Sequence, residues 1–319
     1  MGTARRYAPF LLVGCCALAS GCGLNTAVIQ KGGNGRQGVL LNYSCGAGVC
    51  DPIDPAKPTI VITHGWNPLP NRIHTTFAES GARALRCRCG DSYNILSWDW
   101  NGVRVKALNN EPVRIGREQG RMMAAALMSR GVDPGRTQII AHSLGTLAAT
   151  QAAVCLAHST GARVAQLTLL DPPKQLHEEI FDKLCATGHA RCVENYWSPG
   201  VSGYGDHVSR PGVQNFVVRG TTPVRGIVDL SISNHVYVMR WYYETMRCPQ
   251  MKCGFQNSVF IGCCGSRAWR GEYGEDQADP SEAGELAVQD KAGAVDDERR
   301  AAADSPVYTA ATSAGSRKR

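Results

Sequence analysis

The sequence predicts an α/β fold, with a mostly parallel sheet that is covered by helices on both faces. The chain has 319 residues, of which 43% are hydrophobic and 19% charged, so it can bury one sizeable core. From residue 59 onwards, short apolar runs alternate with longer stretches in which apolar residues recur at helical spacing. Such alternation is typical of parallel sheets, whose functional sites lie at the carboxyl ends of the strands.

The first expected strand is 59–63, a continuous apolar run of the kind that is buried on both faces of a sheet. The helix after it is expected within 71–85, because Ile73, Phe77 and Leu85 recur at helical spacing. Further strands are expected at 93–98, 137–141, 164–170, 192–197 and 213–218, and further helices at 113–130, 144–158 and 236–246.

The N-terminus has the pattern of a signal peptide. Arg5 and Arg6 precede an apolar stretch, 7–19, that is too short to span a bilayer as a helix and is followed by small residues. We therefore expect an exported protein. The stretch 18–22 also resembles the lipobox of bacterial lipoproteins, which implies a lipid anchor on Cys22 and, in a diderm bacterium, the outer membrane. An ordinary cleaved signal peptide, and hence secretion, is the alternative.

Composition divides the mature chain into three parts. Residues 23–57 are rich in Gly, Asn and Pro and are expected to form a tether or loop, and residues 58–265 hold the alternating strands and helices of the folded domain. Residues 266–319 contain almost no large apolar residues, so this charged tail is expected to be disordered. The net charge of +7 is scattered, so no nucleic-acid partner is expected.

The 14 cysteines fall mostly in close clusters. In an exported chain this pattern predicts disulfides rather than a zinc site, because thiols are oxidised outside the cytosol and the spacings form no pair of CxxC knuckles. No metal or other cofactor is therefore expected. Cys155 lies in an Ala-rich stretch and is expected to be a buried free thiol on a helix. The clusters are Cys45 with Cys50, Cys87 with Cys89, Cys185 with Cys192, Cys248 with Cys253, and Cys263 beside Cys264.

Ser143 lies between an expected strand and an expected helix of small residues, which is the place of the nucleophile in the α/β-hydrolase fold. The backbone must turn sharply there, so the residues two before and two after the serine have to be small. They are Ala141 and Gly145. The usual motif is G-x-S-x-G, and Ala141 departs from it only mildly. We therefore expect the α/β-hydrolase fold, with Ser143 as the nucleophile.

A serine hydroxyl needs a base to remove its proton, and the base needs an acid to orient it. In α/β-hydrolases these residues follow the serine in the order acid, then histidine. His235 lies late in the chain, where the base is expected, and His207 is the alternative. Asp171 directly follows the strand after the nucleophile's, and Asp206 and Asp229 are alternatives for the acid.

The oxyanion hole needs one backbone N–H group from the residue after the nucleophile and another from a loop after an early strand. Leu144 provides the first. His64 and Gly65 end the strand 59–63, so the N–H of Trp66 is expected to provide the second. Asp99 precedes the serine in the chain and is expected to be a structural residue at the end of its strand.

Five segments together resemble the catalytic domain of the pancreatic lipase family. They correspond to the family's early HG strand end, its YN strand ending in DW, its GHSLG elbow, its LDP acid and its late NH base. The resemblance implies Asp171 and His235 as the partners of Ser143, and it implies hydrolysis of a carboxylic ester, most readily a lipid, without a cofactor. The segments are 62–66, 93–100, 141–145, 170–172 and 234–237.

The resemblance also has limits that bear on the substrate. The family's C-terminal β-sandwich has no counterpart in the chain. The interval between Asp171 and His235 is shorter than in full-length lipases, which implies a small lid and leaves phospholipids, galactolipids and soluble esters as candidates besides triglycerides. Two other functions stay open: a non-catalytic envelope lipoprotein that keeps the fold as a binding module, and an acyltransferase or amidase that uses the same three residues.

Overall fold

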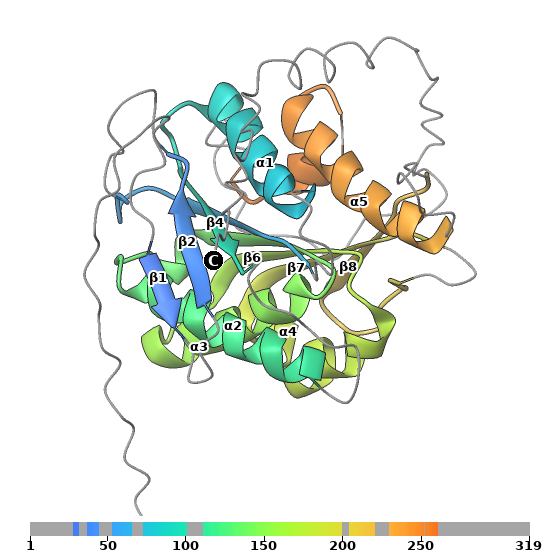
Figure 1. The fold of residues 1–319 in the computed structure, drawn as a ribbon, viewed down its shortest axis with the longest axis horizontal. Helices are drawn as coiled ribbons and strands as arrows, with labels where there is room; N and C mark the ends of the chain where they lie inside the picture. The colour runs from blue at the N-terminus through green and yellow to red at the C-terminus, as the bar shows by residue number, and fades with distance from the viewer. Residues whose placement is uncertain are drawn as a thin grey trace, which may run out of the picture. The chain divides into compact units, whose positions relative to one another are not determined.

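The computed structural model of the chain describes residues 28–31, 37–44, 53–65, 73–100, 111–199, 204–220, 230–251 and 253–260. Its strands form one eight-stranded sheet in the order β1-β2-β4-β3-β5-β6-β7-β8 (Figure 1). β2 is antiparallel to both of its neighbours, and the six strands from β4 to β8 are parallel. The strands are β1 (Val28–Lys31), β2 (Gln37–Asn42), β3 (Thr59–Thr63), β4 (Asn94–Asp99), β5 (Thr137–His142), β6 (Val164–Leu170), β7 (Ala190–Trp197) and β8 (Val213–Val217).

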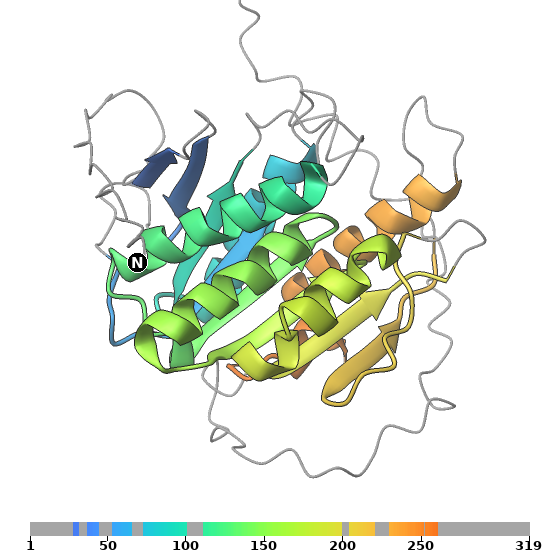
Figure 2. The same ribbon diagram turned by 90° about the horizontal axis from the view of Figure 1, so that it is seen from below.

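Helices cover both faces of this sheet (Figure 2). One face carries α1 (Ile73–Cys89) and α5 (Leu230–Arg247), which pack against each other. The opposite face carries α2 (Glu111–Met128), α3 (Gly145–Thr160) and α4 (Ala186–His189). The mostly parallel sheet flanked by helices, expected from the alternation of apolar runs, is thereby confirmed. Among the described helices none is long and apolar enough to cross a membrane.

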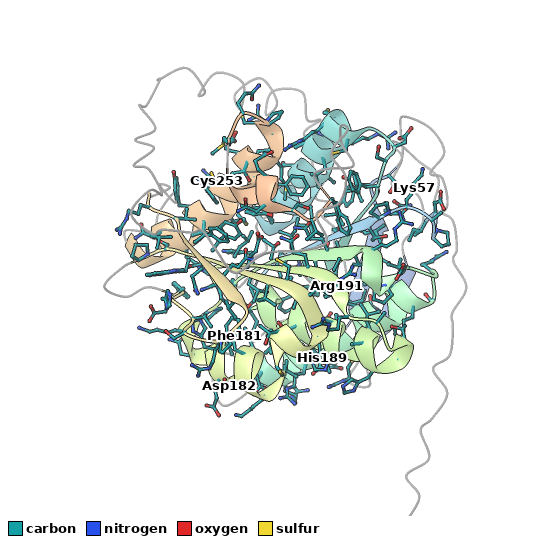
Figure 3. All side chains as sticks on the ribbon, turned by 180° about the vertical axis from the view of Figure 1, so that it is seen from behind. Lys57, Phe181, Asp182, His189, Arg191 and Cys253 are labelled. Atoms are coloured by element: carbon teal, nitrogen blue, oxygen red, sulfur yellow. The ribbon has the colours of Figure 1, made fainter. Side chains whose placement is uncertain are left out.

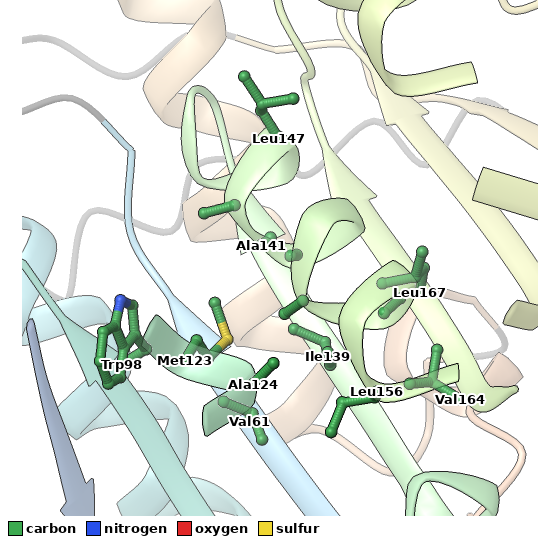
Figure 4. Close-up of a cluster of buried hydrophobic side chains, with 14 of the residues drawn as sticks. Val61, Trp98, Met123, Ala124, Ile139, Ala141, Leu147, Leu156, Val164 and Leu167 are labelled. Atoms are coloured by element: carbon green, nitrogen blue, oxygen red, sulfur yellow. The ribbon is translucent and has the colours of Figure 1, made fainter. Parts of the chain in front are cut away.

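The parallel strands are buried on both faces because their side chains alternate between two cores. Val61, Ile139 and Leu167 belong to the core under α2 and α3, part of which Figure 4 shows. Their sequence neighbours, such as Ile60 and Ile140, point toward α1 and α5. Strands with two buried faces read as continuous apolar runs, which is why these strands were recognisable from sequence.

The expected tether 23–57 is wrong in part, because β1 and β2 lie within it and extend the sheet beyond β4. The glycine content of this stretch had suggested a loop. Gly38, however, lies in β2 against the indole ring of Trp98, where any side chain would collide with that ring. A glycine in a strand here marks a close approach of a large side chain rather than a turn.

Two further differences concern helices. α5 begins at Leu230 rather than at Val236, so His235 lies inside the helix and not in the loop before it. The first residues of α5 include serines and Asn234, which are weak helix formers, and packing overrides that preference. In addition, a π-helical turn at Glu178–Lys183 and the short helix α4 fill the interval between β6 and β7, where no helix was expected.

The segment after α5 returns to the interior of the sheet. A 3₁₀ turn, Gly254–Asn257, is followed by Ser258, whose hydroxyl donates to the side-chain oxygen of Gln138 in β5 at 2.5 Å. The next N–H, that of Val259, donates to the side-chain oxygen of Gln166 in β6 at 2.9 Å. Two adjacent strands therefore hold this segment through buried glutamine side chains.

Disulfides were expected without an assignment of partners, and six of the seven described cysteines are free thiols. Cys87 and Cys89 are two residues apart on α1, so their side chains point in different directions and cannot be bridged. Cys185 is exposed, whereas Cys192 is buried in β7. Cys89 forms a disulfide with a cysteine outside the described residues. The free thiols of the described residues are Cys87, Cys155, Cys185, Cys192, Cys248 and Cys253, while Cys22, Cys45, Cys50, Cys263 and Cys264 lie outside the described residues.

Candidate active site

Ser143 occupies the sharp turn between β5 and α3, with a φ of 55° that non-glycine residues rarely adopt. Two glycines make room for this turn. A side chain at Gly65 would collide with the Cβ atom of Ser143, and one at Gly145 would collide with the backbone oxygen of His64. The N–H of Ser143 donates to the carbonyl oxygen of Leu170 at 3.0 Å, which ties the turn to β6. This backbone is the nucleophile elbow of the α/β-hydrolase fold.

Asp171 and His235 lie in direct contact, although 64 residues separate them in the sequence. The Nδ1 atom of His235 is 2.6 Å from the Oδ2 atom of Asp171. The other carboxylate oxygen, Oδ1, accepts a hydrogen bond from the backbone N–H of Ser198 at 2.8 Å. With both oxygens held, the carboxylate has a fixed direction, and Asp171 is only 1% exposed. The hydrogen on Nδ1 leaves the Nε2 atom of His235 as the basic nitrogen.

The backbone of Asp171 is also held in an unusual conformation, with a φ of 50°. Its N–H donates to the carbonyl oxygen of Tyr196 in β7 at 2.7 Å. The carboxyl group thus stands at the carboxyl edge of the sheet, between the ends of β6 and β7. Gly205 packs against Oδ1 so closely that a side chain at this position would displace it.

His142, the residue before Ser143, connects the turn at Ser143 to His235. Its Nε2 atom donates to the backbone oxygen of His235 at 3.1 Å, and the centroids of the two imidazole rings are 4.4 Å apart. The aromatic ring of Tyr204 stacks on His235, with centroids 4.3 Å apart and planes inclined by 23°. His235 therefore lies between two rings, one from the nucleophile's strand and one from the segment before β8.

The alternative residues lie elsewhere or outside the described residues. His207 is exposed, and its Nδ1 atom contacts the hydroxyl of Ser209 at 3.2 Å. Asp206 is also exposed, and its carboxylate accepts the backbone N–H of His207. Asp229 lies outside the described residues. Neither described alternative joins the cluster around Ser143.

Several hydrogen bonds around His64 hold the end of β3 in place. Its Nδ1 atom donates to the backbone oxygen of Gly65 at 2.7 Å, and its Nε2 atom accepts the N–H of Trp100 at 3.1 Å. Asp99 lies 3.2 Å from the same Nε2 atom, at the end of β4, in the structural position expected for it. The indole N–H of Trp100 donates to the backbone oxygen of His64 at 3.1 Å. The loop that begins at Gly65 therefore starts from a rigid base beside Ser143.

Of the two expected oxyanion donors, one can be placed. Leu144 directly follows the nucleophile and precedes α3, and within the described residues no backbone oxygen accepts its N–H. Trp66 lies outside the described residues. The first donor is thus available where an oxyanion would form, and the second stays a prediction.

Sequence reasoning missed the residues that hold the acid and the base in place. Ser198 acts through its backbone and Gly205 through the absence of a side chain, so neither leaves a recognisable pattern. Tyr204 belongs to a segment between β7 and β8 whose position relative to His235 follows from tertiary structure alone. His142 carried a usable signal, because it is the residue directly before the nucleophile.

A buried carboxyl group also lies in the sheet, outside this site. Glu194 in β7 is fully buried, and burial raises its pKa to about 7, while hydrogen bonds from Gln166, Thr168 and Tyr196 act in the opposite direction. The hydroxyl of Thr168 donates to its Oε2 atom at 3.1 Å. Glu194 points away from Ser143 toward the core under α5, so it belongs to the framework of the sheet.

In comparisons with known proteins, the chain is similar to solved structures. The chain matches no protein-family profile and no curated protein. It is similar to the esterase domain of a Rhodothermus marinus protein, with a TM-score of 0.40 and 14% identity over 69% of this chain and 98% of that one. It is also similar to a Xanthomonas campestris serine hydrolase described as lacking a lid, with a TM-score of 0.44 and 13% identity over 72% and 93%.

A third similar structure is the carboxylesterase EstE1 from a metagenomic library, with a TM-score of 0.39 and 15% identity over 72% of this chain and 89% of that one. Similarity this low does not by itself assign an activity. The strand order and the elbow at Ser143 show that the chain has the α/β-hydrolase fold.

Proposed function

We propose that the chain is a serine hydrolase that cleaves carboxylic esters through an acyl-enzyme. The observation that carries this proposal is the 2.6 Å contact between His235 and Asp171, beside a serine held at a φ of 55° in the strand-to-helix turn. Ser143, Asp171 and His235 stand in the chain order of nucleophile, acid and base in the α/β-hydrolases. They come from three separate elements: the turn after β5, the end of β6 and α5.

The proposed reaction begins when the Nε2 atom of His235 takes the proton of the Ser143 hydroxyl. The serine oxygen attacks the ester carbonyl, and the N–H of Leu144, with that of Trp66 as the expected second donor, stabilises the oxyanion. His235 then gives its proton to the leaving alcohol. Water, activated by the same imidazole, releases the acid and restores Ser143. Asp171 holds the imidazole in its tautomer and stabilises its charged form throughout.

Backbone strain supports catalysis over a purely binding role. Among the described residues, three non-glycine residues have a positive φ, and two of them are Ser143 and Asp171. Such conformations cost on the order of 1–3 kcal/mol each and persist where the surroundings enforce them, commonly at active sites. A protein that used this fold only as a binding module would have no need of strain at both of these residues.

We further propose that the substrate is a lipid or a lipid-like ester, and that the protein is exported and anchored through Cys22. The lipid substrate is supported by the resemblance of five segments to the pancreatic lipase family. Export is supported by the pattern of residues 1–22, which lie outside the described residues. Anchoring would place the active site next to a membrane, where ester lipids are concentrated.

A fluorophosphonate probe tests the enzymatic proposal directly, because it labels serines that a neighbouring base activates. We expect stoichiometric labelling of the wild type and none of Ser143→Ala, with Ser129→Ala on the surface as a matched control that still labels. Labelling that persists in Ser143→Ala, or a folded wild type that does not label, would refute it. Hydrolysis of p-nitrophenyl esters of increasing chain length, and of phospholipid vesicles, then defines the substrate.

Two further measurements separate the remaining alternatives. An acyltransferase would yield a new ester or amide when an alcohol or amine is added to the reaction, whereas a hydrolase yields the free acid. The anchor is tested by fractionation: Cys22→Ala is expected to move the protein from the membrane fraction to the soluble fraction. Retention of Cys22→Ala in the membrane would contradict the lipoprotein proposal while leaving the hydrolase proposal intact.

A further inference from the structure

Two histidines meet on the surface at the end of the sheet opposite the active site. His158 lies in the last turn of α3, and His189 ends α4, directly before β7 (Figure 3 labels His189). Their Nε2 atoms are 3.3 Å apart. The ring centroids are 5.2 Å apart, so the two rings converge with these nitrogen atoms foremost.

The tautomer of His189 is set by the backbone. Its Nδ1 atom lies 3.1 Å from the carbonyl oxygen of Leu184 and 3.1 Å from that of Cys185. Both groups accept, so Nδ1 carries the hydrogen and Nε2 presents a lone pair toward His158. A hydrogen bond from the second ring to a backbone carbonyl is the usual support of a metal-binding histidine, because it fixes the ring and raises its basicity.

The spacing of the two nitrogens also fits a shared metal ion. Without a metal, the 3.3 Å separation is that of a hydrogen bond between the two rings. Two zinc–nitrogen bonds of about 2.0–2.1 Å that meet at the tetrahedral angle place their nitrogens about 3.3–3.4 Å apart. The two Nε2 atoms therefore already have the separation of two ligands of one tetrahedral ion.

We propose that His158 and His189 bind a divalent transition-metal ion of the zinc type. Imidazole suits zinc, copper and nickel, and the two rings provide two ligands. No third His, Cys, Asp or Glu among the described residues completes a cluster with them, so water fills the other positions. This is a site apart from the proposed catalytic one, and its ligands are histidines, unlike the cysteine-based zinc site that was the alternative to disulfides.

The location assigns the ion a structural role. α3 begins two residues after Ser143, and its 14 residues up to His158, at a rise of about 1.5 Å each, span about 20 Å. An ion at this distance cannot contact an ester at Ser143. It would instead clamp the end of α3 to the α4–β7 junction, which otherwise approaches α3 through side-chain packing. Binding to the folded state alone raises the stability of the fold.

Titration calorimetry of the whole mature protein with zinc chloride, after treatment with EDTA, tests this site. We expect one zinc ion to bind to the wild type. His158→Gln and His189→Gln should each lower the association constant by about tenfold or more, since even the loss of a supporting residue costs this much. The double variant has neither imidazole, so it should bind zinc more weakly than either single variant. His207→Gln, another exposed histidine, should bind zinc as the wild type does.

Long-range proton–nitrogen spectra of the wild type provide a second readout that needs no variant. Zinc should shift the Nε2 resonances of His158 and His189 and leave the Nδ1 hydrogen of His189 in place. Absence of zinc binding, or an affinity that is unchanged in both single variants because thiols bind the ion, would overturn the proposal. Esterase activity should not change with zinc in any variant, so this test stands or falls independently of the proposed function.

Discussion

The aromatic ring of Tyr204 covers one face of the His235 imidazole, with the ring centroids 4.3 Å apart. The residue after it, Gly205, packs against the carboxylate of Asp171. One short segment before β8 therefore shields both members of the acid–base pair. During the proposed reaction the imidazole becomes charged, and an aromatic face attracts a cation, so this stacking favours the transition state.

Tyr204→Leu is expected to lower kcat by about 3- to 30-fold, which corresponds to about 0.5–2 kcal/mol of a cation–π interaction. Tyr204→Phe retains the stacked ring and should keep most of the activity. Steady-state hydrolysis of a p-nitrophenyl ester measures both variants. Equal losses in the two variants would show that the hydroxyl, and not the ring, is what matters.

Asp171→Asn is expected to lower kcat by about 10³- to 10⁴-fold while the protein remains folded. The amide oxygen can still accept the N–H of Ser198, so the local backbone is preserved. The amide nitrogen, however, would face Nδ1 of His235 and favour the wrong tautomer. Circular dichroism checks the fold, and kcat is compared with that of the exposed control Asp206→Asn, which should be unaffected. A loss of less than tenfold would remove Asp171 from the mechanism.

Gly145→Ala is expected to destabilise the protein by about 1–3 kcal/mol, the usual cost of overpacking. The added methyl group would lie well under 3.0 Å from the backbone oxygen of His64, which cannot move without disturbing β3. Gly135→Ala provides the control, since its nearest neighbour is the side chain of Asp133. Urea unfolding of both variants measures the difference. Equal stabilities would show that the elbow has more space than its geometry implies.

Glu194 makes stability depend on pH. Its pKa is about 7 in the folded protein and 4.5 in a solvated chain, so between these values the unfolded state binds fewer protons. Stability therefore falls as the pH rises from about 4.5 to about 7, by about 3 kcal/mol, and levels off above. Glu194→Gln should remove this dependence, and the exposed control Glu178→Gln should retain it. Urea unfolding at pH 5 and pH 8 measures the free energy of unfolding of each protein. If it changed with pH equally in the wild type and in Glu194→Gln, the prediction would be refuted.

The cysteines of the folded protein should differ in reactivity at pH 8. Iodoacetamide is expected to label the exposed Cys185 and to spare Cys192, because burial and the nearby Glu194 raise the pKa of that thiol to about 12. After unfolding, Cys192 should label as well. Mass spectrometry of the peptides reads out both states. A disulfide-linked peptide containing both cysteines would contradict the two free thiols of the structure.

Much of the fold was predictable because its parallel strands are buried on both faces. The apolar runs of β3, β5 and β6 appear at almost their observed bounds. β1 and β2 were not predictable, since they are short and flanked by glycines, and β2 depends on the ring of Trp98 for its packing. The start of α5 was misplaced because its first residues include weak helix formers, so their local preference gave no helix signal.

The residues of the candidate site also fall into two groups: those that a local pattern reveals and those that only tertiary structure places. The turn at Ser143 is local, so small residues around it reveal it. The partnership of Asp171 and His235 spans 64 residues and followed from chain order and family resemblance. The contacts of Tyr204 and Gly205 with that pair leave no pattern, because loops are positioned by what they pack against. The oxyanion donor Trp66 stays a prediction.

The boundary of the hydrolase unit is set by hydrogen bonds rather than by the last helix. Gln138 and Gln166 sit in neighbouring strands of the core, and they bind Ser258 and Val259 respectively. A fragment that stopped at the end of α5 would remove the donors to the side-chain oxygens of both glutamines in the interior, at a cost of about 1–3 kcal/mol each. A recombinant catalytic fragment should therefore extend at least to Phe260, whose backbone oxygen also accepts the Tyr93 hydroxyl.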